Sequence, residues 1–161
     1  IRAMPSDFTL KVSCNGSDAT FATHRLKLAA HSAVFFQLFD SGKYKETATG
    51  EFIISDHLPE TVGAMLDYIY NGELDASLSL TQVLALTKLA DQYQVKSLTI
   101  ACEQYLSDKL DKDFEKIYEV AALYNLKNLL PFCLQHIGVD KTRTQAFIDS
   151  ITVENFATLY Q

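Results

Sequence analysis

The sequence predicts an α+β fold, in which helices cap a small three-stranded sheet running from about Phe8 to Ile54 and further helical hairpins follow. Two observations lead to this prediction. Apolar residues recur with the strand period of two up to Phe21, and with the helical period afterwards. Residues 90–106 also nearly repeat at 121–137. A chain of 161 residues suits one domain, or a domain with a small appendage.

The first two strands are predicted to form a hairpin. Residues 8–12 alternate apolar and polar side chains, which indicates a strand with one buried face. Asn15-Gly16 is a hairpin turn signal, and 19–22 is the expected returning strand. The third strand is Phe52-Ile53-Ile54, a short run of β-branched and aromatic residues.

Residues 24–39 are the apolar stretch against which we expect the rest of the chain to pack. Leu26, Leu28 and the two alanines that follow predict one short helix. Ser32 offers an N-cap hydroxyl for a second helix over 33–39, whose apolar residues have helical spacing. Both helices are too short to be stable in water without tertiary packing.

Longer helices are predicted downstream. Pro59 suits the first turn of a helix that ends before Gly72. Glu73-Leu74-Asp75 is a candidate for a very short edge strand, and Ser79 or Thr81 caps the next helix.

Alanine, tyrosine, lysine, leucine, cysteine and glutamine recur between the two similar segments at a constant offset of 31 positions. This indicates a repeated helical hairpin. Two amphipathic hairpins that merely share a period are the alternative.

An ordered set of residues resembles a BTB (POZ) domain. It consists of His24, Leu28-Ala29-Ala30, Ser32 and Phe35, preceded by 6–10 and followed by Tyr70-Asn71-Gly72. The resemblance covers residues 6–110. Residues 111–161 resemble the start of the BACK or cullin-box helical extension, and we expect that extension to be truncated here.

Composition excludes several classes of protein. The net charge is −6, and the basic residues are dispersed, so we expect no nucleic-acid binding. No apolar run is long enough to cross a bilayer, and we expect no membrane association. Cys14, Cys102 and Cys133 lack metal-ligand spacing, and the last two sit in apolar helical patterns as buried thiols. A reducing compartment, cytoplasmic or nuclear, fits best.

No pattern of residues predicts an enzyme. The sequence contains no nucleophile elbow, zincin, phosphate-loop or dinucleotide-binding motif. The four histidines are scattered, and His24 is interpreted as a structural residue at a helix entry rather than a ligand or base. We therefore expect no cofactor and no metal.

The resemblance implies a cullin-binding site. Tyr44-Lys45-Glu46 resembles the hydrophobic-x-Glu motif with which BTB adaptors grip the N-terminal region of their cullin, with Asn71 and the helix after Asp113 lining the rest of the groove. An ordinary solvated loop is the alternative. Asp7 and Arg25 match positions that form a charged pocket in BTB transcription factors. Otherwise they are a surface ion pair worth at most about 1 kcal/mol.

The resemblance thus implies a non-enzymatic adaptor, the substrate-recruiting subunit of a cullin-RING ubiquitin ligase, with its unknown substrate held by regions outside this chain. The alternative is a self-association and corepressor-recruiting module of a transcription regulator. Many BTB dimers use an extra helix before the first strand. Only 1–5 precede Ser6 here, so we expect a monomer or a weak homodimer.

Overall fold

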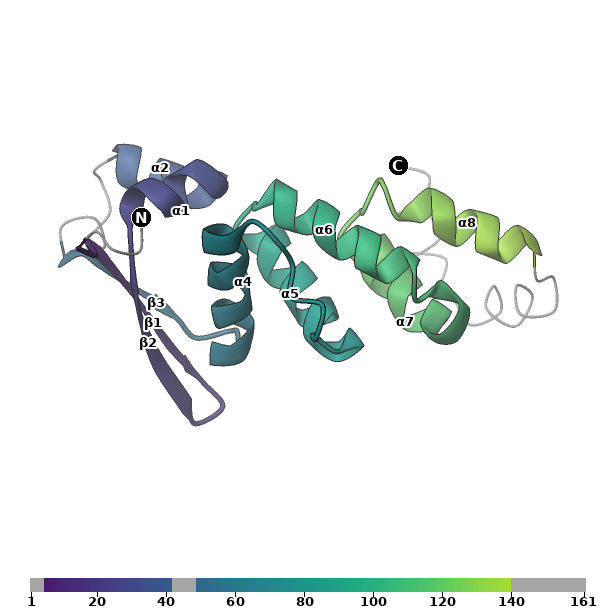
Figure 1. Cartoon of the computed structure of the whole chain (residues 1–161), viewed down its shortest axis with the longest axis horizontal. Coiled ribbons are helices and arrows are strands. Elements are labelled where there is room, and N and C mark those ends of the chain that lie inside the picture. The colour runs from purple at the N-terminus through teal and green to yellow at the C-terminus, as the bar shows by residue number, and fades with distance from the viewer. Residues whose placement is uncertain (1–4, 42–48, 140–161) are drawn as a thin grey trace. The chain divides into compact units, whose positions relative to one another are not determined.

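The computed structural model describes residues 5–41 and 49–139, which divide into two compact units at Thr99 and Ile100 (Figure 1). In the described residues the elements run in the order β1 (Phe8–Cys14), β2 (Ser17–Thr23), α1 (Arg25–His31), α2 (Ala33–Ser41), β3 (Glu51–Ile54), α4 (Pro59–Asn71), α5 (Leu80–Gln92), α6 (Lys96–Ser107), α7 (Leu110–Leu123) and α8 (Leu130–Val139). The expected α+β fold, a small three-stranded sheet with several helices, is confirmed.

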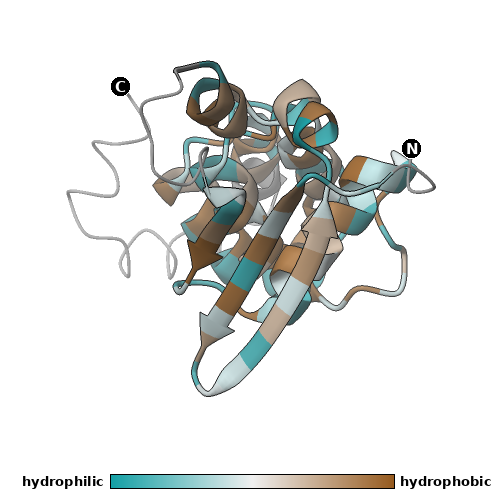
Figure 2. Cartoon of the chain, turned by 90° about the vertical axis from the view of Figure 1, so that its left-hand side faces the viewer, coloured by the Kyte–Doolittle hydropathy of each residue, from teal (hydrophilic) through white to brown (hydrophobic). Residues whose placement is uncertain are grey.

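The sheet has the strand order β2-β1-β3. β1 and β2 form the predicted antiparallel hairpin, and Asn15 and Gly16 turn it with φ values of 52° and 79°. Asparagine and glycine tolerate this left-handed backbone better than other residues do. β3 pairs with β1 in parallel, so α1 and α2 belong to the crossover between them. Hydrophobic and hydrophilic residues alternate along β1 (Figure 2), which buries Phe8, Leu10 and Val12.

Aromatic rings fill the core beside α2. The fully buried ring of Phe35 lies 5.3 Å from Tyr93, nearly parallel to it, and 5.6 Å from Phe52 in an edge-to-face contact. Phe39 stacks 6.0 Å from Phe35 and meets Phe8 edge to face at 4.8 Å. Such pairs add to the free energy gained from burial alone. The predicted apolar centre is therefore the meeting point of β1, β3, α2 and the end of α5.

Ser32 separates α1 from α2 as expected. Its hydroxyl accepts a hydrogen bond from the Phe35 backbone N–H at 3.1 Å and donates one to the Tyr93 carbonyl at 2.5 Å. The expectation that the whole stretch is core was wrong for Leu26, which is 72 % exposed, whereas Leu28 is fully buried. Leu26 and Leu28 are two residues apart, which places their side chains about 200° apart around the helix axis. A helix that packs through one face therefore cannot bury both.

The connection from α4 to α5 differs from the prediction. Pro59 opens α4, and Gly72 ends it with a φ of 80°. The short strand expected at Glu73-Leu74-Asp75 was wrong, because the Asp75 carboxylate accepts bonds from the backbone N–H and hydroxyl of Ser77 and bends the chain. These bonds lower the pKa of Asp75. Ser79 rather than Thr81 caps α5, in a capping box with Gln82.

The internal repeat extends to the backbone. Gln94 and Asn125 both adopt positive φ, at 53° and 51°. The next residue in each copy donates its N–H over 2.9 Å, from Val95 to Ala90 and from Leu126 to Ala121. Each pair of equivalent positions is 31 residues apart. The turn between α5 and α6 therefore has the same backbone conformation as the turn after α7, in the connection to α8.

The second unit contains most of α6 together with α7 and α8. α7 has non-helical dihedral angles at Asp113, which divide it into two helical pieces. Cys102 and Cys133 are buried as predicted, and burial raises the pKa of the Cys133 thiol to about 12. The helix expected over 152–160 lies outside the described residues.

Candidate functional site

The tyrosine and glutamate of the predicted cullin motif, Tyr44 and Glu46, lie outside the described residues. The structure describes what flanks them. α2 ends at Ser41 and β3 begins at Glu51, so the motif belongs to the segment that joins the second crossover helix to the edge strand. The geometry of the site is therefore built from the described residues alone.

Asn71, the third predicted cullin residue, is the last residue of α4 and is exposed. The left-handed Gly72 follows it and donates its N–H to the Tyr68 carbonyl at 2.7 Å. This cap ends the helix abruptly and presents the Asn71 side chain to solvent. α7, the helix predicted to extend the same groove, belongs to the second unit.

Asp7 and Arg25 lie together at the start of α1. One Asp7 carboxylate oxygen accepts a hydrogen bond from the Arg25 backbone N–H at 2.8 Å, and the Arg25 Nε donates to the Asp7 carbonyl at 3.3 Å. The guanidinium also lies 5.4 Å from the centre of the Phe8 ring and 5.6 Å from that of Phe39. Asp7 therefore caps α1 from outside the helix, since His24 makes no side-chain cap.

A contact between His24 and Tyr70 was missed by sequence reasoning. The Tyr70 hydroxyl lies 2.7 Å from His24 Nδ1 and accepts the His24 backbone N–H at 3.1 Å. The bond joins the entry of α1 to the end of α4 across 46 positions of sequence. A tyrosine just before a helix-ending glycine was the available signal, but it does not identify the partner.

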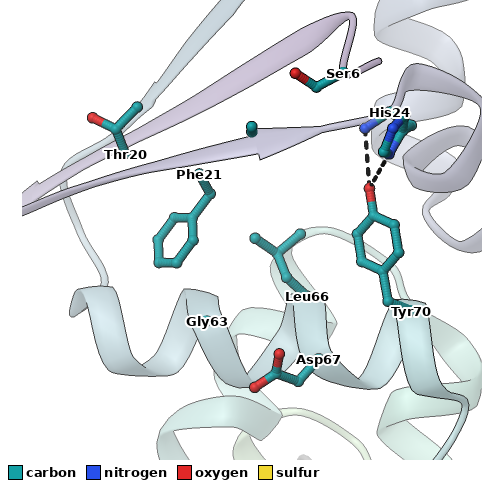
Figure 3. Close-up of a pocket in the computed structure, with 9 residues that line it drawn as sticks. Ser6, Thr20, Phe21, His24, Gly63, Leu66, Asp67 and Tyr70 are labelled. Carbon is teal, nitrogen blue, oxygen red and sulfur yellow. Dashed lines mark hydrogen bonds between the residues drawn. The ribbon is translucent and has the colours of Figure 1, made fainter. Parts of the chain in front are cut away.

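Beside this bond lies a cavity of about 520 Å³, hereafter the β2–α4 groove (Figure 3). Residues 20–22 of β2 line it on the sheet side. On the helix side Gly63, Leu66 and Asp67 line it, and Tyr70 points up to His24 at one end (Figure 3). The Phe21 ring points toward Gly63, where an added Cβ would lie 3.6 Å from two ring carbons. The ring and the helix backbone at Gly63 therefore lie within about one van der Waals contact of each other.

A second exposed feature is apolar. Leu26 on α1 and Phe36 and Val34 on α2 are 72 %, 55 % and 36 % exposed. Residues of this type cost free energy when they face water. α1 and α2 therefore keep apolar side chains at the surface that do not pack into the core of the first unit.

Two kinds of feature are absent from the described ranges. No group of three or more histidine, cysteine, aspartate or glutamate side chains there could hold a metal ion. No helix in residues 5–41 and 49–139 is long and apolar enough to cross a membrane.

Comparison with known proteins places these features in a family. Residues 3–110 match the family model of the BTB/POZ domain. The BTB and MATH domain-containing protein 40 of Caenorhabditis elegans is 32 % identical over 60 % of this chain and 24 % of its own length. A BTB/POZ domain-containing protein of Arabidopsis thaliana is 31 % identical over 84 % of this chain and 41 % of its own length.

Two further similarities complete the comparison. Kelch-like protein 41b of Danio rerio is 34 % identical over 65 % of this chain and 16 % of its own length. The solved BTB domain of zebrafish PATZ1 is 19 % identical with a TM-score of 0.48, over 62 % of this chain and 75 % of that chain. The chain spans less than half the length of the curated relatives named here.

Proposed function

Because the chain belongs to the BTB/POZ family, we propose that it is a protein-interaction adaptor, not an enzyme, which docks a cullin N-terminal region in a ubiquitin ligase complex. Regions outside this chain would recruit the substrate. The observation that carries the proposal is the sequence Tyr44-Lys45-Glu46 in the connection between α2 and β3 of a BTB fold. Residues 111–161 would supply the start of the BACK-like helical extension.

Each residue of the motif has a distinct physical task in this proposal. A tyrosine fills a partner's pocket with little loss of side-chain entropy, so Tyr44 serves as the anchor. A carboxylate beside it fixes the register through a charge-assisted hydrogen bond, which is the role of Glu46. Asn71 adds amide hydrogen bonds from the exposed end of α4. α7 would line the remainder of the contact.

Calorimetry of the whole chain with a cullin N-terminal region tests the proposal. Tyr44→Ala should weaken binding by about 2 kcal/mol, the cost of removing a typical interface anchor. Glu46→Lys should weaken it more, because it replaces an attraction with a repulsion. Glu60→Lys is the matched control, since Glu60 is exposed in the first turn of α4 and outside the proposed contact.

The proposal fails if the parent chain does not bind, or if Tyr44→Ala and Glu46→Lys bind as tightly as Glu60→Lys. Far-UV circular dichroism of each variant must match the parent, so that a loss of binding reports the contact and not the fold.

The exposed apolar residues of α1 and α2 favour self-association as a second function. Leu26, Val34 and Phe36 could supply the apolar patch that a two-fold interface needs. In a corepressor-recruiting module, Asp7 and Arg25 would form the charged pocket beside it. Light scattering at low micromolar protein distinguishes the two functions, and we expect a monomer or a weak dimer. A mass near twice 18.0 kDa would favour self-association, provided that Phe36→Glu returns the mass to that of the monomer.

A further inference from the structure

The outer edge of β2 carries backbone groups that make no backbone hydrogen bond to the residues in 5–41 and 49–139. The Thr9 N–H donates to the Gly50 carbonyl at 2.8 Å, so the backbone of Thr9 faces β3, and by alternation that of Leu10 faces β2. Leu10 is opposite Phe21 in the antiparallel register. The N–H and C=O groups of the neighbouring Thr20 and Ala22 consequently point away from the sheet.

These groups border the β2–α4 groove. Figure 3 shows the Thr20 side chain pointing away from α4 while the Phe21 ring points toward it, as alternation along a strand requires. The edge of β2 is therefore a backbone template above an apolar floor of Phe21 and Leu66. A strand added to this edge would direct every second side chain into the groove.

The charged side chains of β2 and α4 are all acidic. β2 and α4 together carry Asp18, Glu60 and Asp67 and contain no lysine or arginine. Asp67 is exposed and lines the groove one helical turn beyond Gly63, about 6 Å along the axis. Two residues of an extended strand span about 7 Å. If one side chain of the added strand lies over Phe21, the side chain two positions along that strand therefore reaches Asp67.

We propose that the β2–α4 groove binds an extended peptide segment of a partner protein, added as a strand to the edge of β2. One apolar side chain of the peptide lies over Phe21 and Leu66, and a lysine or arginine two positions away pairs with Asp67. Asn71, the described residue of the proposed cullin contact, does not line the groove.

Charge distinguishes such a peptide from a second copy of β2 as the occupant. The strand Ser17–Thr23 contains one aspartate and no cation. Pairing it with itself would bring two copies of Asp18 and Asp67 to one edge, and the added strand would supply no cation to pair with them. Like charges in such positions oppose association. A cationic peptide removes this repulsion.

The probe is a fluorescein-labelled peptide of sequence Thr-Lys-Thr-Leu-Thr-Lys-Thr, blocked at both ends. Its lysines lie two positions on either side of the leucine, so one of them meets Asp67 whichever way the strand runs. Fluorescence anisotropy with the 161-residue chain measures binding. A matched peptide with glutamate in place of both lysines should bind at least about fivefold more weakly.

Variants of the chain test the two contacts separately. Asp67→Lys should reverse the preference between the two peptides, whereas Asp91→Lys, the same exchange at an exposed position of α5, should not. Ala22→Pro removes one edge N–H and should weaken binding by about fivefold. Ile53→Pro is its control, because the same alternation turns the Ile53 amide away from β1 on the opposite edge of the sheet.

Hydrogen exchange of the amides locates the peptide. Saturation with the lysine peptide should slow exchange at Thr20 and Ala22 and leave Phe21, which already bonds to β1, unchanged. A probe N-methylated on the amides that face β2 should not bind, which tests the backbone contact even if Ala22→Pro does not fold.

The proposal is overturned if the two peptides bind equally, if neither binds at about 1 mM, or if protection appears elsewhere. It is also overturned if light scattering shows a dimer that Ala22→Pro dissociates and Ile53→Pro does not, since the occupant is then a second copy. Cullin binding by Ala22→Pro and Asp67→Lys should equal that of the parent, so failure here leaves the cullin proposal intact.

Discussion

The turn after α5 and the turn after α7 have the same backbone but different surroundings. In both, a tyrosine caps the helix, the next residue adopts positive φ, and the residue after that bonds back five positions. Tyr93 is 4 % exposed and stacks on Phe35, and its carbonyl accepts the Ser32 hydroxyl. Tyr124 is only half-buried. Local sequence thus specifies the turn, and tertiary contacts decide how much stability depends on it.

The largest expected effect comes from removing the two tyrosines in turn. Tyr93→Ala should lower the free energy of unfolding by about 3 kcal/mol, because it empties a site packed on all sides. Tyr124→Ala should cost about 1 kcal/mol, since part of its ring already contacts water. Urea unfolding followed by circular dichroism measures both values. Equal losses would mean that the turns depend equally on their tyrosines.

Ser32→Ala sharpens the comparison, because it removes a tertiary contact that only the turn after α5 makes. The variant loses the N-cap of α2 and the hydrogen bond to the Tyr93 carbonyl, so we expect a loss of about 1–2 kcal/mol. Ser97→Ala, at an exposed position of α6, should change stability by less than about 0.5 kcal/mol. Similar losses in the two variants would show that the buried hydroxyl contributes little.

Glycine at the positive-φ position tests the part that the two turns share. Gln94→Gly should stabilise the chain by about 0.5–1 kcal/mol, because a side chain at φ 53° is strained. Asn125→Gly should gain less, since asparagine tolerates this conformation better than glutamine does. A loss of stability at either position, in thermal unfolding, would contradict this account of the turn.

At one pair of equivalent positions in the repeat, the charged residue is buried and the apolar residue is exposed. Glu103 is 5 % exposed, whereas Leu134, which lies 31 positions later, is 50 % exposed. The Glu103 carboxylate accepts backbone hydrogen bonds from Asn128 and Leu129, and its Oε2 has no partner among the described residues. Burial raises the pKa of Glu103 above its ordinary value, and those two bonds oppose the shift.

This raised pKa predicts a small pH effect. A carboxyl whose pKa is higher in the folded chain destabilises the fold once it is ionised, and that cost disappears as the pH falls through the raised pKa. Glu103→Gln keeps an acceptor for the two backbone N–H groups and cannot ionise. It should be more stable than the parent at pH 7 by less than about 1 kcal/mol, with the difference shrinking toward pH 4. Thermal unfolding across this range measures it, and a pH-independent difference would be the contrary result.

Most elements were predictable because each rests on a local signal. The Asn15-Gly16 turn, the Ser32 cap and the helix between Pro59 and Gly72 depend on residues close in sequence. The strand expected at 73–75 failed for a local reason as well, because Asp75 bonds to Ser77. A side chain that competes for backbone hydrogen bonds outweighs β propensity in so short a segment.

The site depended on distant contacts that no local pattern contains. His24 and Tyr70 are 46 positions apart, and Asp7 reaches Arg25 over 18. The β2–α4 groove is bordered by Phe21 of β2 and Gly63 of α4, and only the packing of the helix on the sheet brings these two residues together. Tyr44 and Glu46 remain predictions from resemblance.

The parallel pairing of β1 and β3 also has a kinetic consequence. The β1–β2 hairpin closes through two residues and can form within microseconds. β3 joins β1 only after α1, α2 and residues 42–48 have brought Glu51 beside Thr9, a closure of about 40 residues. Because the entropy of closing a loop grows only logarithmically, adding residues to 42–48 would slow folding little. The segment proposed to grip a partner can therefore change in length during evolution at small cost to the sheet.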